Sequence, residues 1–158
     1  MSAPVLKAEA ARKLIRHEDD LHAWSLEQAE CLKQARFGDL DLEHLADEIA
    51  DVGGQQYDKL ESALRLIFLH MLKWDYQPSF RSRSWVNTIN EQRRQVQRVL
   101  RKSPSLKSAF DEAVTEAYES ARSEASSETD IDIKIFPAVS PYTRDEFMGR
   151  PFAWPVVD

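Results

Sequence analysis

The chain has 158 residues, of which 42% are hydrophobic and 30% charged, and this composition excludes a disordered chain and suits one globular domain. The one cysteine, Cys31, excludes an internal disulfide and a CxxC metal site, and we therefore expect a cytoplasmic protein with a buried thiol. The net charge of −6 argues against a general nucleic-acid binder. The most apolar stretch, residues 63–72, is too short and too polar to span a membrane.

The first predicted helix covers about residues 17–36. Apolar and small residues recur there at helical spacing, including Leu21, Trp24 and Cys31. Gly38 follows the helix and suits a left-handed position after the helix end. Either Asp39 or Asp41 can then cap the next helix.

The second predicted helix is long and runs from about Leu42 to Trp74. Its core-facing stripe follows three-and-four spacing and consists of Leu42, Leu45, Ile49, Val52, Gln56, Leu60, Leu64, Ile67, Met71 and Trp74. Gly53 and Gly54 interrupt the stripe, which predicts a kink or a close helix contact. Pro78 prevents the helix from continuing.

Two further helices and an irregular arm follow. Ser84 is predicted to cap the third helix, whose stripe is Val86, Ile89, Arg93, Val96 and Leu100. Ser103-Pro104 predicts the start of the fourth helix, and the helical pattern fails after Thr129. The segment Thr143 to Glu146 has the pattern of a capping box for one short helix.

Together these elements predict an all-α fold. We expect an antiparallel helical bundle of about four main helices over residues 17–128, with an irregular C-terminal arm over residues 129–158 that contains the short extra helix. Residues 1–158 would form a single domain. Phe147, Phe152 and Trp154 in the arm need apolar surroundings, so we expect the arm to pack on the bundle or on a second subunit.

Several motifs in a fixed order make the chain resemble a known family. They include Leu69-His70-Met71-Leu72-Lys73-Trp74, Gln77-Pro78, Arg81-Ser82-Arg83-Ser84-Trp85 and Ser103-Pro104-Ser105-Leu106. With them, residues 18–148 resemble the bacterial domain of unknown function 29 family. The resemblance implies an all-α fold and a bacterial cytoplasmic protein, and it implies no activity.

The second helix offers a candidate metal or acid–base site. His44 and Glu48 are one turn apart and can ligate one ion, and His70 lies on or beside the apolar stripe, where helical bundles place inward ligands. However, Glu48 and His70 are 22 residues apart, roughly 33 Å along a continuous helix. We favour a solvated acidic face and a hydrogen-bonded core histidine, with no cofactor, over a metal-binding or enzymatic bundle that uses His70 with inward carboxylates.

The third helix carries a concentration of positive charge. Residues 81–102 contain seven basic residues and one acidic residue, a net charge of +6, so the rest of the chain carries −12. The face from Arg81 to Arg101 could bind phosphates, with Trp74 or Trp85 stacking a base. Internal pairing with the acidic second helix is the favoured interpretation, and a nucleic-acid accessory protein is a further alternative.

Arg93 falls on the core-facing stripe between Ile89 and Val96. A buried guanidinium needs a carboxylate or main-chain carbonyls. We predict a buried ion pair of Arg93 with Glu48 or Asp51.

A candidate pocket lies at the end of the bundle near Pro78. If His70 faced a cavity instead of the core, the rim would consist of Trp74, Arg81, Arg83 and Trp85. No small-molecule substrate can be identified from these residues. The apolar arm and the segregated charge favour a non-enzymatic protein-interaction or oligomeric module, a homodimer or part of a small protein complex without a membrane partner.

Overall fold

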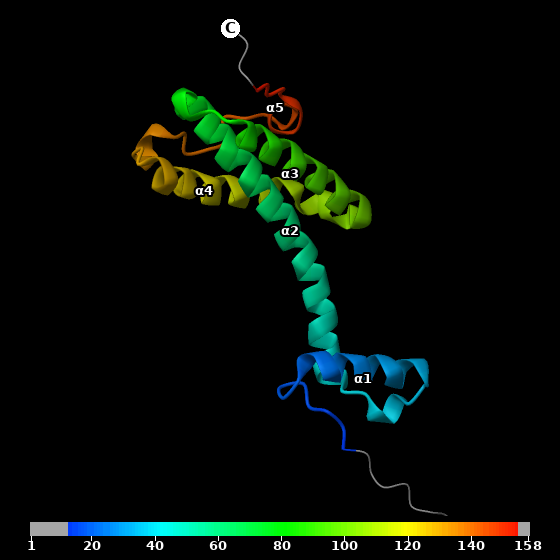
Figure 1. Cartoon of the computed structure of the whole chain (residues 1–158). Coiled ribbons are helices and arrows are strands. Elements are labelled where there is room, and N and C mark those ends of the chain that lie inside the picture. The colour runs from blue at the N-terminus through cyan, green and yellow to red at the C-terminus, as the bar shows by residue number, and fades with distance from the viewer. Residues whose placement is uncertain (1–12, 155–158) are drawn as a thin grey trace, which may run out of the picture. The chain divides into compact units, whose positions relative to one another are not determined.

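The computed structural model describes residues 13–154. Within that range the chain forms five α-helices and four short 3₁₀ turns, and it contains no strand (Figure 1), which confirms the all-α prediction. None of the helices in this range is long and apolar enough to cross a membrane. Contacts divide the chain into two units, residues 1–52 (unit 1) and residues 53–158 (unit 2), and the single domain stays a prediction.

Unit 1 contains helix α1 (Leu21–Lys33), the turn η1 (Phe37–Asp39) and the first turns of α2 (Leu42–Tyr76). Helix α1 starts later than predicted because the Asp20 carboxylate accepts a hydrogen bond from the Ala23 N–H and caps the helix there. After α1, Ala35 adopts the left-handed conformation, with a φ of 55°. Gly38 does not adopt it, so the helix end predicted at this glycine is wrong by three residues.

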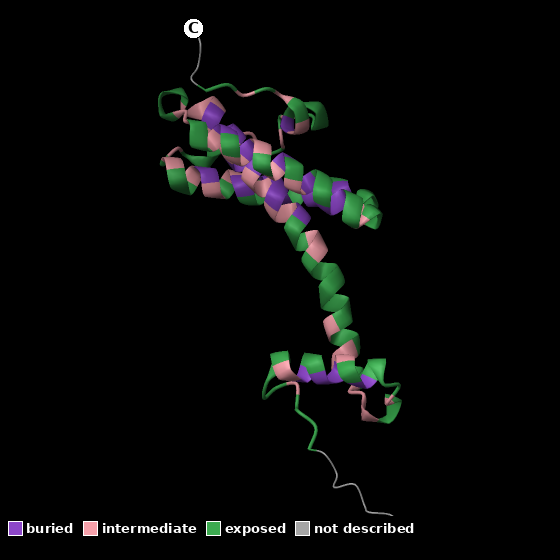
Figure 2. Ribbon diagram, turned by 45° about the vertical axis from the view of Figure 1, so that its right-hand side comes forward, coloured by how far each residue is buried: buried purple, intermediate pink, exposed green. Residues whose placement is uncertain are grey.

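Helix α2 continues through Gly53 and Gly54 without a break. A Cβ atom at either glycine would meet no atom within 4 Å, so neither residue marks a close helix contact. The predicted stripe divides at this point: Leu60 is fully buried, whereas the apolar residues before the glycines are largely exposed. Figure 2 shows the half of α2 that precedes Leu60 mostly in the exposed colour.

Unit 2 is a bundle built from the rest of α2, α3 (Arg83–Lys102) and α4 (Phe110–Thr129). The Ser82 hydroxyl accepts a hydrogen bond from the Trp85 N–H, so Ser82 caps α3 in place of the predicted Ser84. Apolar residues of all three helices form one core, and Figure 2 colours stretches of each of these helices as buried. The fully buried members include Leu60, Leu64, Ile67, Met71, Leu72, Ile89, Ala113, Ala117 and Ala121.

The side-chain contacts give the directions of these helices. Tyr57 donates a hydrogen bond to Glu116 over 2.7 Å, Arg65 pairs with Glu124, and Lys73 pairs with Glu128. Because the residue numbers of the partners increase in the same direction along both helices, α2 and α4 run parallel. The Lys73 ammonium lies 5.0 Å from the Trp85 ring centre, which places the end of α2 beside the start of α3, as an antiparallel connection requires.

The C-terminal arm folds back on unit 2. Tyr118 donates a hydrogen bond to the Pro137 carbonyl over 2.8 Å, and α5 (Arg144–Gly149) begins with the predicted capping box of Thr143 and Glu146. Phe147 is buried against Phe68, with ring centres 5.0 Å apart. The arm therefore supplies part of the core of unit 2.

Candidate functional site

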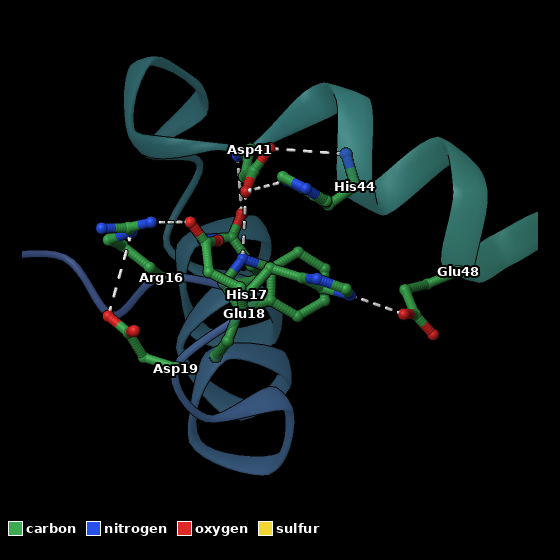
Figure 3. Close-up of polar contacts among 9 residues, drawn as sticks. Arg16, His17, Glu18, Asp19, Asp41, His44 and Glu48 are labelled. Carbon is green, nitrogen blue, oxygen red and sulfur yellow. Dashed lines mark hydrogen bonds and ion pairs between the residues drawn. The ribbon is translucent and has the colours of Figure 1, made fainter.

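Two histidines and two carboxylates meet in unit 1, where the turn before α1 approaches the first turns of α2 (Figure 3). His17 Nε2 lies 2.7 Å from Glu48 Oε1, and His44 Nδ1 lies 2.8 Å from Asp41 Oδ2. The two imidazole rings are stacked, with centres 4.4 Å apart and planes 12° from parallel. The Trp24 ring meets His17 edge-on at 4.8 Å. We call these five residues the His–carboxylate cluster.

Asp41 connects this cluster to α1. Its main-chain N–H donates to Gln28 Oε1 over 2.8 Å, and its carboxylate accepts a hydrogen bond from Trp24 Nε1 over 3.2 Å. Burial alone would raise the pKa of Asp41, but hydrogen bonds from His44 and Trp24 outweigh burial and lower the pKa. Asp41 is therefore a carboxylate at neutral pH and ties α1 to the start of α2.

The cluster consists of two hydrogen-bonded pairs, each of one imidazole and one carboxylate, and the stacking of the two rings joins the pairs. Cys31, the one thiol of the chain, is fully buried in α1 and suits a structural role. The arrangement is suited to holding the two helices together.

The predicted metal pair of His44 and Glu48 has other partners, because His44 contacts Asp41 and Glu48 contacts His17. Over residues 13–154, no group of three or more histidine, cysteine, aspartate or glutamate side chains is arranged to hold a metal ion.

A cavity of about 280 Å³ adjoins the cluster. Its walls are residues 14–18, Gln28 of α1 and residues 38–41, all in unit 1. The Ile15 N–H donates to the Glu27 carboxylate over 2.8 Å and so holds one wall against α1. This volume lies just below the usual range for drug-sized ligands, so the cavity suits only a small molecule.

Of the residues of the predicted pocket near Pro78, the structure brings Trp74 and Arg81 together. His70 is half-buried, and its Nδ1 donates to the Leu66 carbonyl over 2.8 Å; burial lowers the pKa of His70, which favours the neutral ring. This is the hydrogen bond that the core-histidine interpretation expects. The Arg81 guanidinium lies 4.9 Å from the ring centre of the buried Trp74.

The other two residues of that predicted pocket differ in their surroundings. Trp85 is half-buried beneath the Lys73 ammonium, whereas Arg83 is exposed at the first position of α3. The ring faces of both Trp74 and Trp85 are therefore in contact with cations of the same chain. Their role in ligand binding stays a prediction.

Arg93 is buried as predicted, with 8% of its surface exposed, but its partners differ from the predicted carboxylates. Its guanidinium donates to three main-chain carbonyls, those of Glu146, Phe147 and Arg150, over 2.8–3.0 Å. Those carbonyls lie at the C-terminal end of α5, where helix carbonyls need donors from outside the helix, and the Glu146 carbonyl also accepts the main-chain N–H of Arg150. Burial, followed by the charge of Arg150, lowers the pKa of Arg93.

The carboxylates proposed for Arg93 lie in unit 1. Glu48 pairs with His17, and Asp51 is exposed. The prediction of a carboxylate partner was drawn from helical stripes alone, and a short helix far along the chain supplies the acceptors instead.

Asp75 of α2 makes further contacts with the arm. Its two carboxylate oxygens accept hydrogen bonds from the Arg150 guanidinium over 2.7 and 3.0 Å, and one also accepts from the Tyr142 hydroxyl over 2.8 Å. The bond to Asp75 raises the pKa of Arg150, and burial together with the charge of Asp75 raises the pKa of Tyr142. We call Asp75, Arg93, Tyr142 and Arg150 the arm clamp.

The comparisons with known proteins give one match. The family model described as "Domain of unknown function DUF29" matches residues 17–153. The chain belongs to the DUF29 family. No curated protein and no solved structure matches it. In this DUF29 chain the matched range begins at His17, so it contains the whole His–carboxylate cluster and the whole arm clamp.

Sequence reasoning missed several members of both sites of this DUF29 protein. His17 precedes α1 and lies on no helical stripe, and no sequence pattern singled out Asp75. Asp41 was noted solely as a cap. A histidine or aspartate next to a helix end is a weak signal for such contacts, because helix ends leave main-chain groups that need partners.

Proposed function

We propose that this DUF29 chain is a non-enzymatic interaction module that forms a homodimer through unit 1. One observation carries the proposal: Leu42, Ile49 and Val52 of α2 have 69%, 68% and 59% of their surfaces exposed. We call these three residues the α2 apolar face. Large apolar side chains that lie together in water are a feature of interaction surfaces.

The α2 apolar face is narrow and regular. At 100° per residue, its three side chains fall within an arc of about 80°, and Glu43, Asp47 and Asp51 point to the opposite side of the helix. With the half-buried Leu45, the apolar positions alternate by three and four residues. This is the spacing of the seam between two packed helices.

A second copy of the chain is the occupant that fits this seam. It supplies a stripe of the same spacing and length, which a closed twofold dimer requires. Further exposed apolar side chains in the same unit, Leu21, Leu26 and Leu32 of α1 and Phe37 of η1, extend the area available to such a contact. Acidic residues on the far side of α2 would stay in water.

The polar groups of unit 1 support a role without catalysis. His17, Asp41, His44 and Glu48 are each hydrogen-bonded to another side chain of the cluster. These bonds fix α1 against the start of α2 and so hold the α2 apolar face in place.

The test is the molar mass of the full chain, measured by light scattering over a dilution series. Burying one leucine or isoleucine side chain contributes about 1.5–3 kcal/mol, and Leu42→Gln with Ile49→Gln removes four such side chains from a dimer. We therefore expect the dimer dissociation constant to rise at least about a hundredfold.

The matched control is Asp47→Gln with Asp51→Gln, which introduces the same two glutamines on the acidic side of the same helix segment. It should remain dimeric. A wild-type chain that is monomeric at every concentration, or a control that dissociates as readily as the apolar variant, would contradict the proposal.

The basic face of α3 supports a second candidate function, that of a nucleic-acid accessory protein, which ranks below the interaction module. Arg98 and Arg101 are exposed, and so is Arg94, which pairs with Glu91 of its own helix. Retention on nucleic acid that weakens steeply with salt, and that is lost in Arg98→Gln with Arg101→Gln, would support this function.

A further inference from the structure

The cavity in unit 1 is lined by the largely buried side chain of Gln28, whose amide N–H lacks a partner among residues 13–154. Gln28 is 2% exposed, and its Oε1 atom is fixed as an acceptor by the Asp41 N–H. Its Nε2 amide has no hydrogen-bond partner within residues 13–154. Every fully buried side-chain nitrogen or oxygen in that range has a partner, so the Nε2 atom is not fully buried. The amide must therefore face the open space of the cavity that Gln28 lines.

From this geometry we propose that the cavity binds a small α-amino amide, a molecule with an ammonium group, an uncharged carbonyl and a short aliphatic chain. The carbonyl would accept a hydrogen bond from Gln28 Nε2. Because Nε2 is accessible from the cavity, a ligand carbonyl there can replace solvent as its acceptor.

The charge around the cavity selects for a cationic ligand over a carboxylate. Two arginines, Arg16 and Arg36, are outnumbered by the carboxylates beside them. Arg16 pairs with Glu18 and Asp19, Arg36 pairs with Asp39, and Asp41 and Glu48 belong to the His–carboxylate cluster. Three of these carboxylates, those of Glu18, Asp39 and Asp41, line the cavity together with one guanidinium, that of Arg16. The lining is net negative whether or not His17 carries a charge, which attracts an ammonium ion and repels an additional carboxylate.

The walls of the cavity set the rest of the ligand. Leu14, Ile15 and Leu40 supply apolar surface beside the polar groups. The volume of about 280 Å³ suits a molecule about the size of one amino acid. An aliphatic chain of three or four carbons would cover these three side chains.

The proposal is independent of dimer formation, because none of the cavity residues belongs to the α2 apolar face. The probe is leucinamide, which carries all three groups. Three analogues each change one: 4-methylpentanamide lacks the amine, 3-methylbutylamine lacks the carbonyl, and leucine replaces the amide with a carboxylate. Binding to the full chain is followed by titration of ¹H–¹⁵N NMR resonances.

We expect saturable shifts from leucinamide at residues 14–18, Gln28 and residues 38–41, and roughly tenfold weaker binding of each analogue, which corresponds to one hydrogen bond or one charge contact. Gln28→Glu keeps the acceptor for the Asp41 N–H and removes the donor. The Gln28→Glu substitution should therefore abolish the preference for leucinamide over 3-methylbutylamine. Gln55→Glu, the same change at an exposed position of α2, should leave that preference unchanged.

If Gln28→Glu unfolds unit 1, Leu40→Ala provides the second variant, and it should reduce the preference for leucinamide over glycinamide. The proposal is overturned if leucinamide produces no saturable shifts at the cavity, or if leucine binds as well as leucinamide. It is also overturned if a folded Gln28→Glu protein retains the wild-type preference.

Discussion

Replacing Arg93 tests whether the arm is held by the carbonyls at the end of α5. The substitution Arg93→Met keeps a long apolar side chain on the core stripe of α3 and removes the guanidinium. Three acceptors lose the guanidinium as a donor, although the Glu146 carbonyl keeps the main-chain N–H of Arg150, and the three bonds differ in their access to water. The bond to the Phe147 carbonyl is buried, whereas those to Glu146 and Arg150 are partly exposed.

The expected loss of stability follows from that difference. A buried carbonyl left without a donor is unfavourable by about 1–3 kcal/mol, and a bond whose acceptor water can reach contributes about 0.5–1.5 kcal/mol. Methionine needs no desolvation of a charge, which offsets part of the loss. We therefore expect unit 2 to lose about 2–4 kcal/mol, a drop in Tm of roughly 5–12 °C for a chain of this length.

The assay combines urea unfolding, followed by circular dichroism, with hydrogen exchange of the amides in α5. The control is Arg94→Met, one residue along the same helix, where the side chain is exposed and pairs with Glu91. The control should lose less than about 1 kcal/mol. Equal midpoints for the two variants, or unchanged protection of α5 in Arg93→Met, would refute the reasoning.

Three further outcomes follow from the described contacts. Asp75→Asn should lower the stability of unit 2 by about 1–3 kcal/mol, because the Arg150 guanidinium loses its charged partner; a midpoint equal to that of wild type in thermal unfolding would show that Asp75 does not hold the arm. Burial lowers the pKa of His70, so the unfolded chain binds the proton more tightly and wild-type stability should decline as the pH falls below about 6.5. His70→Gln should remove that part of the decline, and identical pH profiles of the two proteins in urea unfolding would contradict this. The pKa of Asp41 is lowered, so its contribution to unit 1 should be present above about pH 3.9 and lost as the pH falls through the folded pKa. The Trp24 indole N–H resonance should report that loss in wild type and be shifted at every pH in Asp41→Asn, and an indole resonance unaffected by the substitution would exclude the bond.

The helices and their caps were accessible from the sequence because they depend on neighbours a few residues away. Three-and-four spacing located α2, α3 and α4, and the capping box of Thr143 and Glu146 located α5. Local rules failed where two of them competed. Ser82 and Ser84 are both capping residues, and Ala35, not Gly38, takes the left-handed conformation.

Only the tertiary structure decided which face of a helix is buried and which partner a polar side chain finds. The stripe from Leu42 to Trp74 has one periodicity, yet its first half is exposed and its second half is core, because periodicity marks an apolar face without showing what covers it. Arg93 was expected to be buried from its stripe alone, but its acceptors lie more than 50 residues further along the chain. Contacts of that kind depend on how the chain folds back, which no local pattern encodes.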